Sequence, residues 1–194
     1  MGKVYIFLAN GYEEIEGLTV VDLLRRAGIE TVMVSITGEI LVSGSHHIAS
    51  KADVLFEDCD FTDADLFVLP GGLPGTNNLK AHLGLDCLLK RADREGKIIA
   101  AICAAPSVLG AKGLLEGKMA ICYPGHEDAL IGAKIIPADV VEDENIITSK
   151  GMGTAIDFSL ALICKLAGSK TAETIAKAIQ YRHYEESFKA GDQA

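Results

Sequence analysis

The sequence lacks the features that would place the protein at a membrane or on a nucleic acid. No apolar run in its 194 residues reaches the roughly 18 residues that a membrane-spanning helix requires. The first residues, MGKVYIFLANGYEE, show neither a signal-peptide pattern nor a myristoylation motif. Lysine and arginine total 18 against 27 acidic residues, and the net charge of −9 disfavours binding to phosphate backbones. We therefore expect a cytoplasmic protein with no membrane or nucleic-acid partner.

Patterns typical of disulfides, metal sites and nucleotide sites are also missing. The five cysteines are odd in number and include no C-x-x-C pair, which argues against a disulfide framework and a structural zinc site. Cys122, His126 and Glu127 could ligate a metal, but their spacing matches no structural zinc pattern. GGLPG and GMG do not match the dinucleotide-binding and P-loop motifs. We expect no metal and no cofactor, and we expect Cys87 and Cys164 to pack as small apolar side chains.

Short apolar runs alternate with longer amphipathic ones along the chain. Runs rich in β-forming residues predict strands, and apolar residues at helical spacing predict helices. Continuous apolar strands separated by helices imply a mainly parallel sheet covered on both faces, so we predict one domain, residues 1–194, with a three-layer α/β/α fold. The predicted strands are 3–9, 31–36, 65–72, 97–103, 119–123, 138–143 and 145–150, the predicted helices are 15–28, 83–96, 154–167 and 172–181, and a small two-strand excursion covers 36–54.

Three strand-to-helix turns contain unusual chemistry. They are NGYEEIEG after the first strand, PGGLPG after the third, and CAAP after the fourth. In a parallel sheet covered by helices these turns open at the carboxyl edge, where ligands collect. The sequence therefore predicts a crevice that brings together the glutamates of the first turn, Gly71 and Gly72 of the second, and Cys103 of the third.

Cys103 ends a buried strand and is followed by small residues and by Pro106 near a helix start. A side chain on such a tight turn points outward, as in a nucleophile elbow. The positive end of the following helix would lower the thiol pKa and favour the thiolate. A buried structural cysteine in an alanine-rich core is the alternative, but the position on the turn favours a nucleophile or redox centre.

The glutamates of the first turn have different interpretations. Glu13 and Glu14 stand at a helix start, where the helix dipole alone explains them. Glu16 stands one turn further in, beside the apolar Ile15. If its side chain points into the crevice, burial and a nearby thiolate would raise its pKa, and the protonated carboxyl group could serve as acid and base in turn.

The glycines after the third strand expose backbone N–H groups without side chains. Gly71 and Gly72 could direct an N–H to a developing oxyanion, with the Ala104 N–H as the second donor. A tight turn that needs positive φ explains the same glycines, and both interpretations can hold together.

Cysteine chemistry often uses a histidine. His126 follows a predicted strand and could reach the crevice. We expect the other histidines, which are His46, His47, His82 and His183, to face solvent. We expect the mixed-charge end of the chain, residues 181–194, to be a solvated helix end.

Several motifs together resemble the ThiJ/PfpI superfamily, and within it the branch of the Parkinson-disease protein deglycase (DJ-one) and its bacterial relatives. The resemblance rests on GYEEIE, VVDLLRRAGI, VLPGG, IIAAICAAP and TSKGMGTAIDFSLAL, and it extends in order over about residues 3–179. It implies a flavodoxin-like fold and a homodimer. It further implies an easily oxidised nucleophile at Cys103, a protonated hydrogen-bonded partner at Glu16, and oxyanion donors at Gly72 and Ala104.

This sequence departs from the family pattern at three positions. The protease-like branch has a histidine directly after the nucleophile, and Ala104 in its place argues against a peptidase. The human-type branch has His-Pro in the strand after the elbow, where this chain has Tyr123-Pro124. Either the Tyr123 phenol takes that polar role or His126 moves in. An arginine that the family often places in the excursion corresponds to His46.

The resemblance implies two classes of function. One is a cysteine-dependent, glutathione-independent glyoxalase or deglycase that acts on small 2-oxoaldehydes or their adducts. The other is a non-enzymatic sensor of oxidative stress, or a chaperone, that works through a Cys103 sulfinate.

Overall fold

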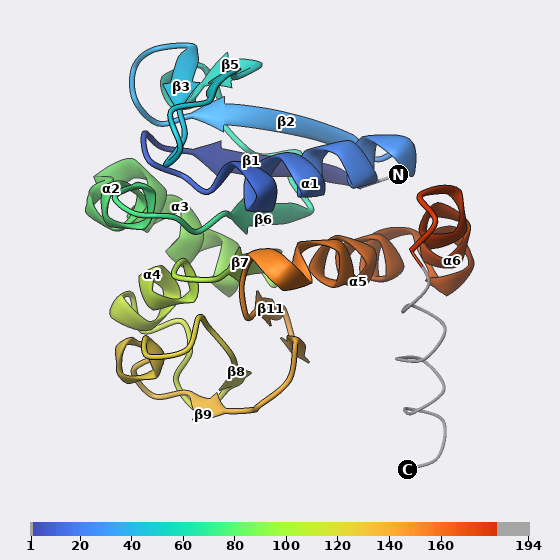
Figure 1. Ribbon diagram of the computed structural model, residues 1–194. Helices are drawn as coiled ribbons and strands as arrows, with labels where there is room; N and C mark the ends of the chain where they lie inside the picture. Colours follow the sequence, from blue (N-terminus) through green and yellow to red (C-terminus); the bar gives the residue numbers. More distant parts are fainter. Residues whose placement is uncertain (1, 182–194) are drawn as a thin grey trace.

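The computed structural model describes residues 2–181 of the chain. Its centre is a seven-stranded sheet in which all neighbouring strands are parallel except the antiparallel pair β10–β11 at one edge (Figure 1). In spatial order the strands are β10 (Val140–Asp143), β11 (Ile146–Ser149), β7 (Ile98–Ile102), β6 (Leu66–Leu69), β1 (Lys3–Leu8), β2 (Glu30–Ser35) and β5 (Val54–Leu55).

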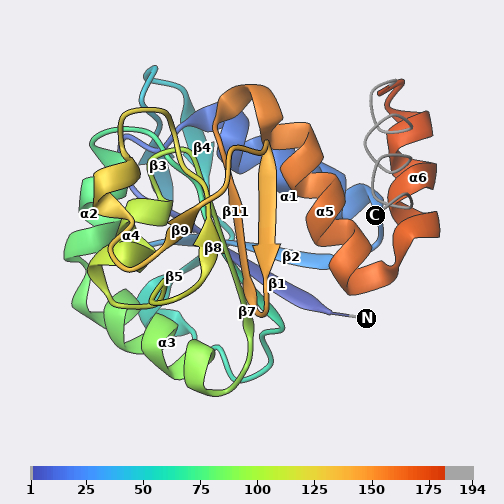
Figure 2. The same ribbon diagram turned by 90° about the horizontal axis from the view of Figure 1, so that it is seen from below.

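Helices cover both faces of this sheet (Figure 2). Side chains of β1 alternate between the two layers: Ile6 and Leu8 pack in one core, and Tyr5 and Phe7 in the other. This arrangement confirms the predicted three-layer α/β/α fold. The first layer contains α1 (Glu14–Arg26), α5 (Ala155–Ala167) and α6 (Ser169–Ala178), and the second contains α2 (Gly75–Ala81), α3 (Leu83–Arg94) and α4 (Pro106–Ala111).

Helix α1 starts directly after the first strand-to-helix turn, and its residues explain why a helix forms there. Acidic residues occupy its first turn and Arg25 and Arg26 its last, which matches the helix dipole at both ends. Val20 and Leu24 are fully buried against the sheet. Gly28, with a φ of 74°, then turns the chain toward β2.

The excursion after β2 folds back onto the turn between β1 and α1. It forms the antiparallel pair β3 (Leu41–Ser43) and β4 (Ala49–Lys51), which we call the hairpin. The Gly11 N–H donates to the Ser43 carbonyl at 2.8 Å, and the Ser45 N–H donates to the Tyr12 carbonyl at 2.8 Å. These bonds fix the hairpin against the segment that leads into α1.

Some elements differ from the sequence prediction. The predicted strand 119–123 is only β8 (Met119–Ala120), which pairs with β9 (Lys134–Ile135) in a separate small sheet. Helix α2 was not expected because its sequence, GTNNLKA, contains glycine and asparagine, which are poor helix formers. His183 and most of the predicted solvated tail lie outside the described residues.

Two side chains were wrongly placed by sequence reasoning. Cys87 is exposed on α3 rather than packed in the core. His82 does not face solvent freely, because its ring packs on Phe56 with centroids 4.5 Å apart and its Nδ1 accepts the Leu85 N–H at 3.0 Å. It is therefore the N-cap of α3. Among the described helices none is long and apolar enough to span a membrane.

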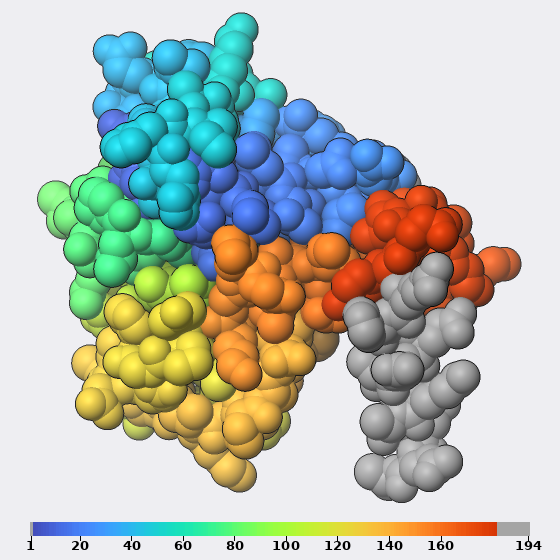
Figure 3. All heavy atoms as spheres, viewed as in Figure 1, coloured from blue at the N-terminus to red at the C-terminus, as the bar shows by residue number. Residues whose placement is uncertain are grey.

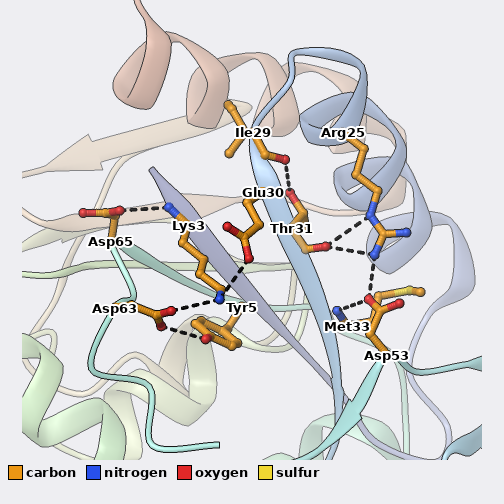
Figure 4. Close-up of polar contacts among 10 residues, drawn as sticks. All are labelled: Lys3, Tyr5, Arg25, Ile29, Glu30, Thr31, Met33, Asp53, Asp63 and Asp65. Atoms are coloured by element: carbon orange, nitrogen blue, oxygen red, sulfur yellow. Dashed lines mark hydrogen bonds and ion pairs between the residues drawn. The ribbon is translucent and has the colours of Figure 1, made fainter. Parts of the chain in front are cut away.

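Charged side chains gather near the amino ends of β1 and β2, away from the carboxyl edge (Figure 4). Lys3 Nζ lies 2.9 Å from Glu30 and 2.8 Å from Asp63, and the Tyr5 hydroxyl donates to Asp63 at 2.7 Å. Arg25 donates to the Thr31 carbonyl and so ties the end of α1 to β2. Such exposed pairs contribute little to stability individually.

Candidate active site

Cys103 stands at the turn between β7 and α4, with a φ of 64°. The left-handed region is uncommon for residues other than glycine, and a strained residue at this point is typical of a nucleophile elbow. The Cys103 N–H donates to the Ser149 carbonyl at 2.9 Å, and its carbonyl accepts the Tyr123 N–H at 2.8 Å. The main chain of the elbow is therefore held from both sides, and the side chain is partly buried.

Glu16 lies in the first turn of α1 and is fully buried. Its Oε2 accepts the Gly71 N–H at 2.9 Å. Its Oε1 is buried and has no hydrogen-bond partner of ordinary geometry within residues 2–181. A buried carboxylate with one unpartnered oxygen is costly, so this oxygen favours a proton.

Gly71 allows the carboxyl group and the thiol to approach each other. A Cβ atom at this position would lie 2.6 Å from Glu16 Oε2 and 2.7 Å from the Cys103 Cβ, which is too close for any other residue. Its N–H is already donated to Glu16, so the expectation that Gly71 offers an N–H to an oxyanion is wrong. Gly71 instead orients the carboxyl group.

Gly72 and Ala104 each place a backbone N–H group at the sulfur. Their backbone N–H groups both interact with the Cys103 thiol in a way that lowers its pKa. Gly72 has a φ of 87°, and a side chain there would collide with the backbone nitrogen of Glu13. The structure therefore brings together two peptide donors where negative charge on sulfur, or on an attached oxygen, would develop.

The pKa of Cys103 moves opposite to the sequence expectation. The pKa of the thiol is raised to about 12: burial is the main cause, the negative charge of Glu16 and the contact with that carboxyl group add to it, and the two backbone N–H groups oppose the rise. Helix α4 has only six residues, and its N-terminus does not outweigh these effects. A proton on Glu16 removes the charge that opposes the thiolate.

The pKa of Glu16 is raised to about 7. Burial is the main cause, and the negative charge of Glu13 adds to it; the contacts with Cys103 and with the Gly71 N–H act in the opposite direction. The carboxyl group and the thiol are in contact, so the protonation state of each affects the pKa of the other, and the carboxyl group changes its charge near neutral pH. The sequence predicted this direction for Glu16 and burial as its main cause, but the expectation that the Cys103 sulfur also raises the Glu16 pKa is wrong, because the added negative charge comes from Glu13.

The helix dipole does not fully explain Glu13 and Glu14. Glu14 is buried, and its Oε1 accepts the His46 N–H at 2.8 Å and the Ile48 N–H at 3.3 Å. Ser45 Oγ donates to both carboxylates at 3.1 Å. Burial opposes ionisation of Glu14, but hydrogen bonds from its own backbone N–H, from the backbone and side chain of His46 and from the Ile48 N–H outweigh burial and lower its pKa to about 2. In Figure 3 the cyan atoms of the hairpin region lie against the blue atoms around the start of α1.

Tyr123 and His126, the two candidates for the role of the family histidine, lie beside the elbow. The Tyr123 backbone N–H contacts Cys103, while its half-exposed side chain lies over Gly151. The His126 ring packs edge-on against the Tyr123 ring with centroids 6.1 Å apart. In the described part of the chain, neither side chain hydrogen-bonds the thiol, so their roles stay predictions.

One group of described side chains could in principle hold a metal ion. One oxygen or nitrogen atom from each of Glu13, Glu14 and His46 lie within 4.8 Å of one another. Hydrogen bonds to Ser45 and within the group already account for this arrangement. Cys122, His126 and Glu127 form no comparable group among residues 2–181.

A cysteine elbow on a covered parallel sheet, with a buried glutamate across a glycine turn, defines a class of cysteine-site α/β proteins. Residues 2–165 match the model of the DJ-1/PfpI family, and the chain belongs to this family. The Arabidopsis thaliana "Protein DJ-1 homolog B" is 38% identical over 93% of this chain. The chain spans 42% of that relative, less than half of its length.

For two further relatives the match spans most of both chains. An oxidized DJ-1 from Toxoplasma gondii is 36% identical, with a TM-score of 0.91 over 94% of this chain and 100% of that one. A Caenorhabditis elegans protein named glutathione-independent glyoxalase is 32% identical over 86% of this chain and 89% of its own length. The fold and the family therefore agree with the sequence-based resemblance.

Proposed function

We propose that this protein is a cysteine-dependent, glutathione-independent glyoxalase that converts small 2-oxoaldehydes such as methylglyoxal to 2-hydroxy acids, or acts on their adducts. The observation that carries the proposal is the buried Glu16 carboxyl group coupled to the Cys103 thiol across Gly71. Membership of the DJ-1/PfpI family and the name of the worm relative support it.

The first chemical step is addition of sulfur to the aldehyde carbon. Glu16, as carboxylate, takes the thiol proton, and the Cys103 sulfur attacks C1 of methylglyoxal to form a C–S bond. The carbonyl π electrons move to the C1 oxygen, and the N–H groups of Gly72 and Ala104 stabilise the resulting oxyanion. The proton on Glu16 then moves to this oxygen, which gives a neutral hemithioacetal and restores the carboxylate.

The second step moves a proton between two carbons. Glu16 removes the proton from C1, the electron pair forms a C1–C2 double bond, the C2 carbonyl π electrons move to the C2 oxygen, and Glu16 donates its proton to that oxygen to give an enediol. Glu16 then takes the proton of the C1 hydroxyl group, the C1–O double bond forms, and the same proton is delivered to C2, which yields a lactoyl thioester. Water then attacks the thioester, the C–S bond breaks, and lactate and the Cys103 thiol are released. The net reaction adds one water and needs no external oxidant or reductant.

The test is direct measurement of lactate from methylglyoxal. Wild-type protein should produce lactate, whereas Cys103→Ala and Glu16→Gln should reduce the rate by at least about 100-fold, the usual contribution of a general acid–base group. Cys87→Ser is the matched control, because it removes an exposed thiol on α3. It should retain wild-type activity. Equal product from wild type and Cys103→Ala would rule the proposal out.

A redox-sensor function is the second candidate. Cys103 is partly accessible, and its site holds two N–H donors and a carboxyl group that could stabilise a sulfinate. Oxidation would use two equivalents of peroxide: the first converts the thiolate to sulfenic acid, and the second to sulfinic acid with release of water. A sensor would show no meaningful lactate production but would gain two oxygen atoms, confined to Cys103, under mild peroxide.

A further inference from the structure

Glu13 borders the site described above without belonging to the Cys103–Glu16 pair. Its N–H donates to the Gly71 carbonyl at 2.9 Å, and its backbone nitrogen lies where a side chain on Gly72 would have to go. The main chain of Glu13 therefore packs on both glycines that flank the sulfur. Its negative charge also acts on Glu16.

The carboxylate of Glu13 is held in place by the hairpin. Ser45 Oγ donates to Glu13 Oε2 at 3.1 Å, and His46 Nδ1 lies 3.6 Å from the same oxygen. The Glu13 side chain is 15% exposed to solvent. A fixed and only slightly exposed charge acts more strongly on a nearby ligand than a freely solvated one.

The ionisable groups that act on the thiol and on its partner Glu16 are acidic. The charged group that acts on Cys103 most strongly is Glu16, and Glu13 acts on Glu16 in turn. Within residues 2–181, Glu13 and Glu14 share a single ion-pair partner, His46, whose side chain is 67% exposed. One exposed histidine cannot neutralise two carboxylates, so the site keeps an excess of negative charge.

We infer that Glu13 sets the substrate class of this site by selecting uncharged carbonyl compounds over those that carry a carboxylate or phosphate. The inference rests on the proposed function for its substrates. An anionic 2-oxoaldehyde brought to Cys103 would place its charge near that of Glu13, whereas methylglyoxal carries none. At high effective dielectric, repulsion between two like unit charges that lie near each other corresponds to a roughly three- to tenfold difference in rate.

A pair of alkylating reagents tests this charge selection without requiring turnover. Iodoacetamide and iodoacetate are nearly identical in size, and both form a C–S bond to the thiolate with loss of iodide, but only iodoacetate is anionic. The rate constant at Cys103 would be measured for each reagent by peptide mass spectrometry. The ratio of the two rates cancels any change in the thiolate fraction. Cys87 in the same molecule is an internal reference.

The Glu13→Gln variant should raise the iodoacetate-to-iodoacetamide ratio at Cys103 by about three- to tenfold at low salt. The ratio at Cys87 should stay constant. The glutamine amide oxygen can still accept the Ser45 hydroxyl, so the hairpin contact is preserved. Glu30→Gln removes the same charge at the amino end of β2 and should leave the Cys103 ratio unchanged. An equal Cys103 ratio in wild type and Glu13→Gln would overturn the inference.

Two further measurements separate this inference from the proposed function. High salt should raise the wild-type ratio at Cys103 toward that of Glu13→Gln, because screening weakens the repulsion. Hydroxypyruvaldehyde phosphate should be converted less efficiently than methylglyoxal, and Glu13→Gln should narrow that difference. If lactate never forms but the alkylation ratio responds, charge selection holds and the glyoxalase proposal fails. If lactate forms but the alkylation ratio does not respond, the glyoxalase proposal holds and charge selection by Glu13 fails.

Discussion

At the scale of single residues, the side chains of Cys103 and Glu16 both resist ionisation. Each group is buried enough that ionisation is costly, and ionisation of one makes ionisation of the other harder. The thiol therefore keeps its proton at neutral pH, and the neighbouring carboxyl group, with a pKa of about 7, can both accept and donate a proton there. That property suits a proton shuttle better than a permanently ionised thiolate would.

The raised pKa of Glu16 also has a consequence for stability. A carboxyl group whose pKa is about 7 when folded and 4.5 when unfolded stabilises the fold in its protonated form at low pH, and this contribution is lost as pH rises through about 7. Glu16→Gln should therefore raise the free energy of unfolding at about pH 8 by roughly 2–3 kcal/mol, with little effect near pH 4. Urea denaturation of the reduced protein at both pH values measures this.

An exposed glutamate is the matched control for that experiment. Glu39 lies in the exposed loop between β2 and β3, and Glu39→Gln should leave the free energy of unfolding nearly unchanged at both pH values. A Glu16→Gln variant that is less stable than wild type at about pH 8 would contradict the account of a strained, buried carboxyl group.

Sequence reasoning placed Cys103 at a strand-to-helix turn, as the structure has it, but misjudged the direction of its pKa shift and the partner of the Gly71 N–H. The position of Cys103 after an apolar run and before a short helix predicted its place at the sheet edge. The direction of its pKa shift was wrong because that shift depends on burial and on the distance to Glu16. The loss of the Gly71 N–H to Glu16 depends in the same way on contacts between distant segments.

At the scale of elements, the hairpin and the start of α1 form one unit. Glu14 accepts backbone N–H groups from both His46 and Ile48, and Tyr12 donates its hydroxyl to Ser50 at 2.6 Å. The sequence predicted a two-strand excursion but not what it covers. The contacts join residues more than 30 positions apart, and no local pattern encodes such a pairing.

Glu14 should affect stability with the opposite pH dependence to Glu16. Its pKa is about 2 when folded and 4.5 when unfolded, so the ionised form stabilises the fold above about pH 4.5 and this contribution disappears as pH falls toward 2. Glu14→Gln should lower the free energy of unfolding by roughly 2 kcal/mol at pH 7 and by much less near pH 3.

Thermal or urea unfolding at the two pH values would measure the change for Glu14→Gln. His46→Ala is a useful companion variant, because it removes the imidazole but keeps the backbone N–H that Glu14 accepts. It should cost less than Glu14→Gln at neutral pH. A Glu14→Gln penalty that is the same near pH 3 as at pH 7 would show that the carboxylate charge is not what holds the hairpin.

At the scale of the whole molecule, the fold follows from the alternation of apolar strands with amphipathic helices. Strands such as IIAAI are buried on both faces, and only a sheet covered on both sides can satisfy them. This pattern is strong enough to predict the layers and the edge at which the site forms. It is too weak for two-residue strands such as β8, because two residues carry no periodicity.

The central claim is that Glu16 retains a proton up to neutral pH while it lies against the Cys103 thiol. Infrared difference spectroscopy between about pH 5 and about pH 9 measures this directly, because a protonated carboxyl group has a carbonyl band that the carboxylate lacks. The account predicts a band that disappears with a midpoint near pH 7 in wild type and is absent from Glu16→Gln. A wild-type spectrum with no carboxyl band titrating above about pH 5.5 would contradict it.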